Sequence, residues 1–342
     1  AWYKEGAKER FLSGIVNPDD WRKVDDILDV WFDSGSTHAF VLRDREDGSE
    51  DGLADLYLEG TDQHRGWFHS SMLQGNKMSK SLGNTVAPEE VVKQYGADIL
   101  RLWVAQADYT ADLRIGPEIL KGVADGYRRL RNTLRFMLGA LAPFTEADRV
   151  DPADMPELER WVLHRLSELD HKVKKGYETY DFQGVFQQIF NFCTLDLSAF
   201  YFDIRKDALY CDGDTARRRA ARTVLDLLFH RLTTWLAPVL VFTMEEVWLS
   251  RFPGEESSIH LTDIPDTPAD WLDEPLAAKW AMVRQARRVV TAALEVQRTD
   301  KVIGASLEAA PVVHIRDAEM LKALKSVDFA DICITSDLML PG

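Results

Sequence analysis

The segment Lys77-Met78-Ser79-Lys80-Ser81, KMSKS in one-letter code, stands between two parts of the chain with different sequence patterns, and Leu82-Gly83-Asn84 follows it. Two lysines three positions apart, interleaved with hydroxyl side chains and followed by glycine, suit a loop that closes on a polyphosphate. The ammonium groups neutralise charge that develops when a bond to phosphorus breaks, and hydroxyl and backbone N–H groups fill the remaining acceptor sites. This KMSKS segment therefore predicts a phosphate-binding loop, and the alternative is a solvated lysine-rich turn.

Short apolar stretches that end in turn-forming residues precede the KMSKS segment. Residues 27–32 run into Asp33-Ser34-Gly35, and residues 56–58 run into Glu59-Gly60-Thr61-Asp62. Short strands that end in polar loops are typical of an α/β sheet, which presents a site at the carboxyl edge of its strands. Acidic and amide side chains there are placed to bind a ribose diol or an ammonium group, although Asp62 taken alone is equally suited to cap a helix.

After about residue 116 the apolar residues repeat at spacings of three and four, the period of an amphipathic helix. Pro117 suits a first helical turn, and its run continues to residue 141. Further runs cover residues 158–177, 182–204, 217–235 and 276–296. Pro238 is predicted to break or kink the helix before residues 239–249. Long helices with short connections predict a bundle. The tail, at residues 312–315 and 332–334, is predicted to add two short strands.

The composition restricts the class of protein. The 342 residues carry 56 acidic and 41 basic side chains, a formal net charge of −15, and 46% are hydrophobic. This length predicts two or three domains, and the apolar share excludes a disordered chain. No run of about 18 apolar residues occurs, the first five residues include the charged Lys4 and Glu5 where an export signal is apolar, and the three cysteines form no C-x-x-C pair. We expect a cytoplasmic protein without membrane contact, disulfide scaffold or structural zinc.

Three further strings surround the KMSKS segment. They are residues 29–35 (DVWFDSG), residues 57–68 (YLEGTDQHRGWF), and residues 97–103 (ADILRLW) with Asp108-Tyr109-Thr110. With the KMSKS segment they resemble the class I aminoacyl-tRNA synthetases and, within that class, the isoleucyl-tRNA synthetases. Valyl and leucyl relatives share the architecture and remain alternatives. The resemblance runs across essentially the whole chain and is most specific over residues 26–116.

The resemblance implies a fold and a domain order. The fold class is α/β followed by all-α: part of a Rossmann-like class I catalytic domain, then an α-helical anticodon-binding bundle. The implied domains are residues 1–116, the C-terminal part of the catalytic fold; residues 117–270, the helical anticodon-binding bundle; and residues 271–342, a C-terminal helix with a small terminal unit.

The resemblance also implies roles for individual residues. Lys80 would contact the ATP phosphates and stabilise the departing pyrophosphate, with Lys77 and Ser79 shaping the loop. The residues implied to hold the aminoacyl-adenylate are Glu59, Gly60, Asp62 and Gln63. Trp31 and Trp67 would wall the isoleucine pocket, since rigid apolar surfaces suit a branched aliphatic side chain, and ordinary core packing is the alternative for each.

The implied reaction joins isoleucine to tRNA(Ile) through isoleucyl-AMP, with ATP as its Mg²⁺ complex, in an enzyme expected to be a monomer. No metal ligands are expected, because no two histidines stand four positions apart. An apolar pocket separates isoleucine from valine by only about 1–3 kcal/mol, so such enzymes need a separate editing site.

The sequence departs from the family in two places. No His-x-Gly-His occurs among its eight histidines, so the other ATP-binding motif of the family is absent, as are the half of the fold that carries it and the editing domain. Between Leu73 and Lys77 stand only three residues, where the family has a further strand and turn. A helix over residues 66–73 cannot run straight into the KMSKS segment and also supply that strand. We therefore expect a chain gap near residues 74–75, and a fragment inactive alone.

Arginines gather on helices despite the acidic total. Those expected to contact tRNA phosphates are Arg128, Arg131, Arg217 and Arg218. The alternative is that they are solvated helix faces paired with the many acids. Two other functions stay open: a tRNA-binding helical module without catalysis, and a helical scaffold without an RNA partner.

Overall fold

The computed structural model describes residues 6–20, 72–73, 76–77, 86–109 and 113–341. The chain divides into two compact units, residues 1–69 and residues 70–342. In the first unit the described residues form helix α1 (Ala7–Leu12) and the short 3-10 helix η1 (Pro18–Asp20). Among the described residues, no helix has both the length and the apolar character needed to cross a membrane.

The second unit opens with two short antiparallel strands, β1 (Met72–Leu73) and β2 (Asn76–Lys77). Met72 lies opposite Lys77 in this pair. The expected helix over residues 66–73 is therefore wrong for its last two residues, whose backbone groups face a neighbouring strand instead of the preceding helical turn. Two helices follow, α3 (Pro88–Tyr95) and α4 (Ala97–Gln106), and Gly96 joins them with a φ of 93°, a conformation that favours glycine.

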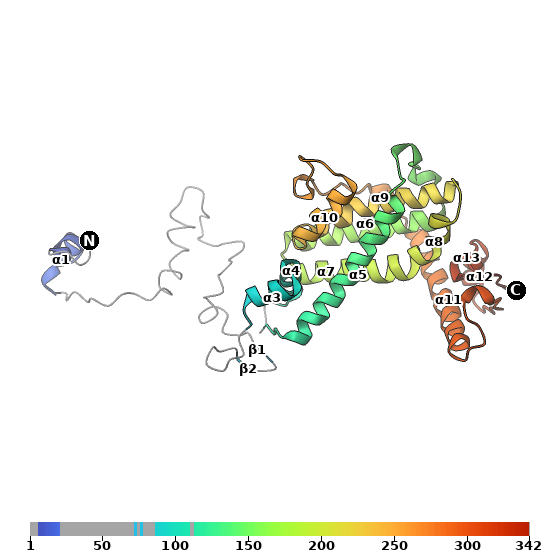
Figure 1. Ribbon diagram of the computed structural model, residues 1–342, viewed down its shortest axis with the longest axis horizontal. Coiled ribbons are helices and arrows are strands. Elements are labelled where there is room, and N and C mark those ends of the chain that lie inside the picture. Colours follow the sequence, from blue (N-terminus) through green and yellow to red (C-terminus); the bar gives the residue numbers. More distant parts are fainter. Residues whose placement is uncertain (1–5, 21–71, 74–75, 78–85, 110–112, 342) are drawn as a thin grey trace. The chain divides into compact units, whose positions relative to one another are not determined.

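The helices from α5 to α10 pack together in a bundle (Figure 1). They are α5 (Pro117–Leu141), α6 (Glu157–Glu178), α7 (Phe182–Asn191), α8 (Asp203–Tyr210), α9 (Ala216–Leu236) and α10 (Val241–Arg251). The helices predicted over residues 117–141, 158–177 and 217–235 are confirmed to within a residue or two, and the break at Pro238 is confirmed. The all-helical second part of the predicted fold class is thereby observed.

The bundle is held by one continuous apolar core. Its largest fully buried side chains include Trp235 and Phe229 of α9, Phe186 of α7 and Met137 of α5. Tyr177 of α6 crosses this core to donate a hydrogen bond of 2.5 Å to the carbonyl of Trp235. Burial raises the pKa of the Tyr177 hydroxyl, so it stays protonated and can donate this bond at every physiological pH.

The run predicted as one helix over residues 182–204 contains a change of helix type. Between α7 and α8 lies the π-helix η7 (Phe192–Phe202). Its wider turns leave Asp196 buried between two cations, Arg165 of α6 and Arg284, at 3.2 and 2.7 Å. A period of three and four does not reveal this change of helix type, because Cys193, Leu197 and Phe200 follow that period and are buried in the π-helix as well.

The C-terminal part comprises α11 (Glu274–Thr299), α12 (Ala318–Lys325) and α13 (Phe329–Cys333). Of the two strands predicted in the tail, the second is wrong, since residues 332–333 lie in α13. The Asp328 side chain caps that helix by accepting a hydrogen bond of 3.0 Å from the N–H of Asp331, which favours helix over strand. The first forms only an isolated parallel bridge, between Val312 and Met339.

Candidate nucleic-acid interface

Helix α5 presents a basic face to solvent. Its apolar positions Leu130, Leu134 and Met137 are buried in the bundle core. The opposite side carries four exposed arginines: Arg128, Arg129, Arg131 and Arg135. We call these four residues the α5 basic face. It includes two of the arginines expected from the sequence to contact tRNA.

The α5 basic face holds more positive charge than its neighbours neutralise. Arg128 is paired with Asp125, and Arg131 lies 3.5 Å from Glu246 of α10. Arg129 and Arg135 have no ion-pair partner among the described residues. Because both existing pairs are solvent-exposed, each is worth little and can be exchanged for a phosphate oxygen. In a chain of net charge −15 this face is a local cationic surface.

The arginines at the start of α9 are used differently. Arg217 lies 3.2 Å from Asp212 and 3.6 Å from Asp331, and Arg218 donates a hydrogen bond of 2.6 Å to the carbonyl of Asp212. Arg219 is paired with Asp214 at 3.3 Å. The structure therefore gives Arg217 and Arg218 internal partners, and their side chains tie the start of α9 to the preceding loop and to α13. No sequence pattern separates them from the arginines of α5.

Most candidate active-site residues lie outside the described residues. These are Trp31, Glu59, Gly60, Asp62, Gln63, Trp67, Ser79 and Lys80. Of Lys77 only the backbone is described, in strand β2. Their roles remain predictions.

Two buried ionic networks were not foreseen from the sequence. In the first, Glu159 of α6 is fully buried and receives hydrogen bonds from Arg205 of α8 at 2.6 and 3.0 Å and from Tyr201 at 3.2 Å. Arg205 also contacts Asp331 of α13 at 3.2 Å. Burial is the largest influence on Tyr201 and raises its pKa far above the usual value, so this hydroxyl remains a donor.

In the second network Asp226 of α9 joins two other segments and a neighbour on its own helix. It accepts hydrogen bonds from Arg149 at 2.7 Å and from Arg251 at 2.5 Å, and His230 lies 3.5 Å away. Burial acts to raise the pKa of Asp226, but hydrogen bonds from these three side chains outweigh it and hold the pKa well below the usual range. In both networks the buried carboxylate is occupied by internal partners, which fits a structural role.

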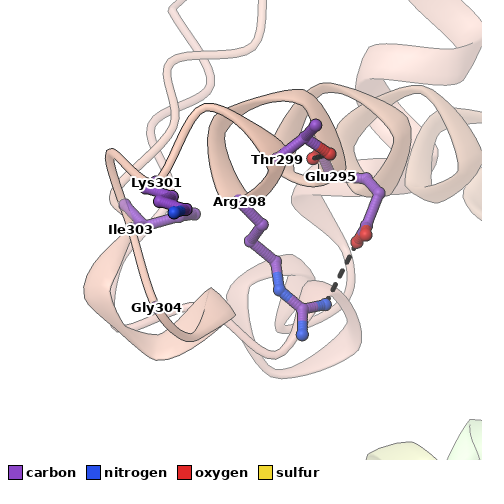
Figure 2. Close-up of a pocket in the computed structure, with 6 residues that line it drawn as sticks. All are labelled: Glu295, Arg298, Thr299, Lys301, Ile303 and Gly304. Carbon is purple, nitrogen blue, oxygen red and sulfur yellow. Dashed lines mark hydrogen bonds and ion pairs between the residues drawn. The ribbon is translucent and has the colours of Figure 1, made fainter.

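An open cavity of about 430 Å³ lies at the end of α11 (Figure 2). Arg298 reaches toward Glu295 there and forms an ion pair of 3.1 Å (Figure 2). Lys301 follows in the turn with a φ of 57°. Cations in and just after the last turn compensate the free carbonyl groups of a helix, so these charges are explained by the helix end.

The described residues offer no metal centre, and two of the three cysteines, Cys193 and Cys333, are buried, while Cys211 is exposed. No group of three or more histidine, cysteine, aspartate or glutamate side chains in the described part of the chain could hold a metal ion. Burial raises the pKa of Cys193 to about 12, and burial likewise raises the pKa of Cys333 to about 12. Both thiols stay protonated, and the thiolate is the reactive form.

Comparison with known proteins gives two family matches. Residues 1–76 and 72–116 match the model of the tRNA synthetases class I (I, L, M and V), and residues 159–314 match that of the anticodon-binding domain of tRNA ligase. Neither α5 nor the rest of residues 117–158 lies in a matched segment.

Relatives match along almost the whole chain. The isoleucine–tRNA ligase of Ruegeria pomeroyi is 70% identical over 361 residues, which cover 98% of this chain and 37% of the relative. That of Brucella abortus is 54% identical over 362 residues, covering 99% and 37%. The chain therefore spans 37% of the length of these curated relatives. A solved ternary complex of LeuRS, tRNA and LeuAMS from Agrobacterium radiobacter aligns with 60% of this chain and 24% of its own at 22% identity and a TM-score of 0.47, too distant for any conclusion here.

Proposed function

This chain belongs to the class I tRNA synthetases, and from that membership we propose that it is a segment of an isoleucine–tRNA ligase that carries the KMSKS segment and the anticodon-binding bundle. The relatives at 70% and 54% identity support isoleucine over valine or leucine, because both are isoleucine–tRNA ligases. The observation that carries tRNA as the partner is the α5 basic face, a surface of four exposed arginines with only two carboxylate neighbours among the described residues.

The proposed reaction has two steps. The carboxylate of isoleucine attacks the α-phosphate of ATP, which forms isoleucyl-AMP and releases pyrophosphate. A hydroxyl of the terminal ribose of tRNA then attacks the acyl carbon, and AMP leaves. Lys80, with Lys77 and Ser79, would stabilise the charge on the departing pyrophosphate of the Mg²⁺–ATP complex. The protein contributes positioning and charge stabilisation more than acid–base chemistry.

The substrate-holding residues belong to the same proposal. The adenylate would be held by Glu59, Gly60, Asp62 and Gln63, at the carboxyl end of a strand. Trp31 and Trp67 would form the walls of the isoleucine pocket.

We also propose that the chain lacks residues near Gln74 and Gly75 that its relatives carry. The class I family model matches in two pieces that meet at residues 72–76. The alignment with the Ruegeria protein runs over 361 residues, although this chain has only 342.

The tRNA proposal predicts salt-dependent binding through α5. Replacing all four arginines of the α5 basic face by alanine is expected to weaken binding of a tRNA(Ile) transcript about 10- to 100-fold and to reduce the slope of log K against log salt by about 2–4, because each lost phosphate contact releases about one counterion fewer. Affinity is measured by fluorescence titration at several salt concentrations.

Two control variants make the test specific. One removes the same charge from four exposed cations near the C-terminus: Arg288, Arg316, Lys322 and Lys325. The other is the Arg217→Ala/Arg218→Ala double variant. Equal losses in the α5 variant and the C-terminal control would mean that binding follows net charge, and an unaffected α5 variant would remove α5 from the interface.

A second expectation concerns catalysis by this polypeptide. The 342-residue chain alone is expected to give no isoleucine-dependent exchange of pyrophosphate into ATP, because it contains no His-x-Gly-His. The measurement is radioactive pyrophosphate exchange, with the full-length Ruegeria relative as positive control. Exchange that requires isoleucine and is lost on Lys80→Ala would contradict the expectation of inactivity.

A further inference from the structure

Helix α10 is capped from a different part of the chain. Its own N-cap residue, Leu240, supplies no capping side chain. Instead Asp98 of α4 accepts hydrogen bonds from the backbone N–H groups of Phe242 at 3.3 Å and Thr243 at 2.7 Å, and from the Thr243 hydroxyl at 2.6 Å. These are the second and third residues of α10, the positions that an N-cap side chain normally serves. Asp98 and Thr243 are both buried.

The turn before α10 is held from the same helix. Arg101 of α4 donates hydrogen bonds to the carbonyl of Val239 at 2.9 Å and to that of Pro238 at 2.8 Å. Asp98 and Arg101 are three positions apart and so share one face of α4. An anion meets the amide end of α10 and a cation meets the free carbonyls of the turn, so each charge matches the local dipole. We call Asp98 and Arg101 the α4 clamp.

A third helix reaches the same corner. The Tyr127 hydroxyl of α5 lies 2.9 Å from the Thr243 hydroxyl, which itself bonds to Asp98. A chain of side-chain hydrogen bonds therefore runs from α5, which carries the basic face, through Thr243 of α10 to α4. Helix α4 lies in the segment that matches the class I synthetases, whereas α10 lies in the segment that matches the anticodon-binding domain.

We propose that Asp98 and Arg101 are positioning residues that fasten the synthetase-family segment to the bundle, so that nucleic acid bound at the α5 basic face also stabilises α4. The part of this inference that concerns nucleic acid rests on the proposed function; the fastening itself does not.

Other caps in the bundle show what a merely local cap looks like. Asp181 accepts a hydrogen bond from Gly184 and Asp273 accepts one from Leu276, in each case three residues away and within the helix being capped. Asp98 stands 144 and 145 positions from its two backbone donors. Loss of a local cap frays one helix end, whereas loss of the α4 clamp also removes a connection between two family segments.

Hydrogen exchange of the full 342-residue chain tests the proposal, read by mass spectrometry on peptides from α4, α9 and α10. The variants are Asp98→Ala, its isosteric partner Asp98→Asn, and Arg101→Met; Asp181→Ala is the matched control. In the unchanged protein α4 is expected to exchange as slowly as α9. In Asp98→Ala the α4 amides are expected to exchange about 10- to 100-fold faster while α9 is unchanged, because buried charge-assisted bonds are lost and α4 can open by itself.

A tRNA(Ile) transcript is the second probe. It is expected to slow exchange in α4 of the unchanged protein, and to bind the Asp98 and Arg101 variants with unaltered affinity but without protecting α4. A residue that only caps α10 would not remove the protection of α4 by tRNA while leaving the affinity for tRNA unaltered. Faster exchange of α4 than α9 in the unchanged protein, or an equal effect of Asp181→Ala on α4, overturns the fastening. Should Asp98→Ala fail to fold, Asp98→Asn and Arg101→Met supply the comparison.

The two proposals fail in different ways. Absence of tRNA binding by the unchanged protein would contradict the proposed function. The fastening would then still be tested by hydrogen exchange in α4, measured without tRNA. If tRNA binds and hydrogen exchange in α4 does not change, only the stabilisation of α4 by bound nucleic acid is contradicted, and the fastening is not.

Discussion

Replacement of Glu159 by glutamine is expected to lower the free energy of unfolding by about 3–5 kcal/mol, because it leaves the buried Arg205 guanidinium without its main counter-charge. The Glu159 side chain is fully buried and that of Arg205 is 6% exposed. The remaining partner, Asp331, lies at 3.2 Å and is 31% exposed, so it compensates only part of the charge. Urea unfolding followed by circular dichroism measures the change.

Two comparisons make the Glu159 experiment decisive. Glu295→Gln breaks the exposed pair with Arg298 and is expected to cost about 0–1 kcal/mol. The double variant Glu159→Met/Arg205→Met removes both charges and is expected to be more stable than Glu159→Gln alone. A loss in Glu159→Gln no larger than in Glu295→Gln would show that the Glu159–Arg205 pair is solvated.

Replacement of Asp226 by asparagine is expected to destabilise the protein by about 3–5 kcal/mol at pH 7, because Arg149 and Arg251 lose a shared carboxylate whose side chain is 4% exposed. The effect depends on pH. Since the folded pKa of Asp226 is depressed, its contribution is fully present above the unfolded pKa of about 3.9 and is lost as pH falls below that value toward the folded pKa.

The measurement for Asp226 is urea unfolding of the unchanged protein and of Asp226→Asn between pH 7 and pH 3. The difference in unfolding free energy between them is expected to be constant from pH 7 to about pH 5 and to shrink below about pH 4. Asp300→Asn, an exposed change at the end of α11, is the control. A difference that is independent of pH down to pH 3 would contradict the role given to the charge.

The sequence predicts the helices well where one face of a helix is buried. Helix α5 is such a case: Leu130, Leu134 and Met137 recur at spacings of four and three on one side, and charges occupy the other. Helix α6 is harder, because Trp161, Val162 and Leu163 are all buried and the helix is surrounded by others. The 3.6-residue period of apolar side chains cannot show that Glu159, a charged residue of the same helix, also points inward.

The candidate interface could be predicted only in part. Arg128 and Arg131 lie on the α5 basic face as expected, whereas Arg217 and Arg218 are held by Asp212, and Arg217 also by Asp331. The two groups look alike in sequence because the second partner of Arg217, Asp331, is more than a hundred positions away, and Arg218 is held by a backbone carbonyl, which no residue type reveals. Likewise, the ADILRLW string contributes to the family resemblance, but the roles of its Asp98 and Arg101 follow only from where the turn before α10 lies.

The contact between Arg205 and Asp331 also bears on the order of events during synthesis. Glu159 and Tyr201 precede Arg205 in the chain, so their bonds can form once α8 has been made. Asp331 follows 126 residues later. At a translation rate of about 5–20 residues per second, that interval is about 6–25 s. During that interval Arg205 has Glu159 but not Asp331 as a counter-charge, so the contact between α8 and α13 is among the last that the bundle completes during synthesis.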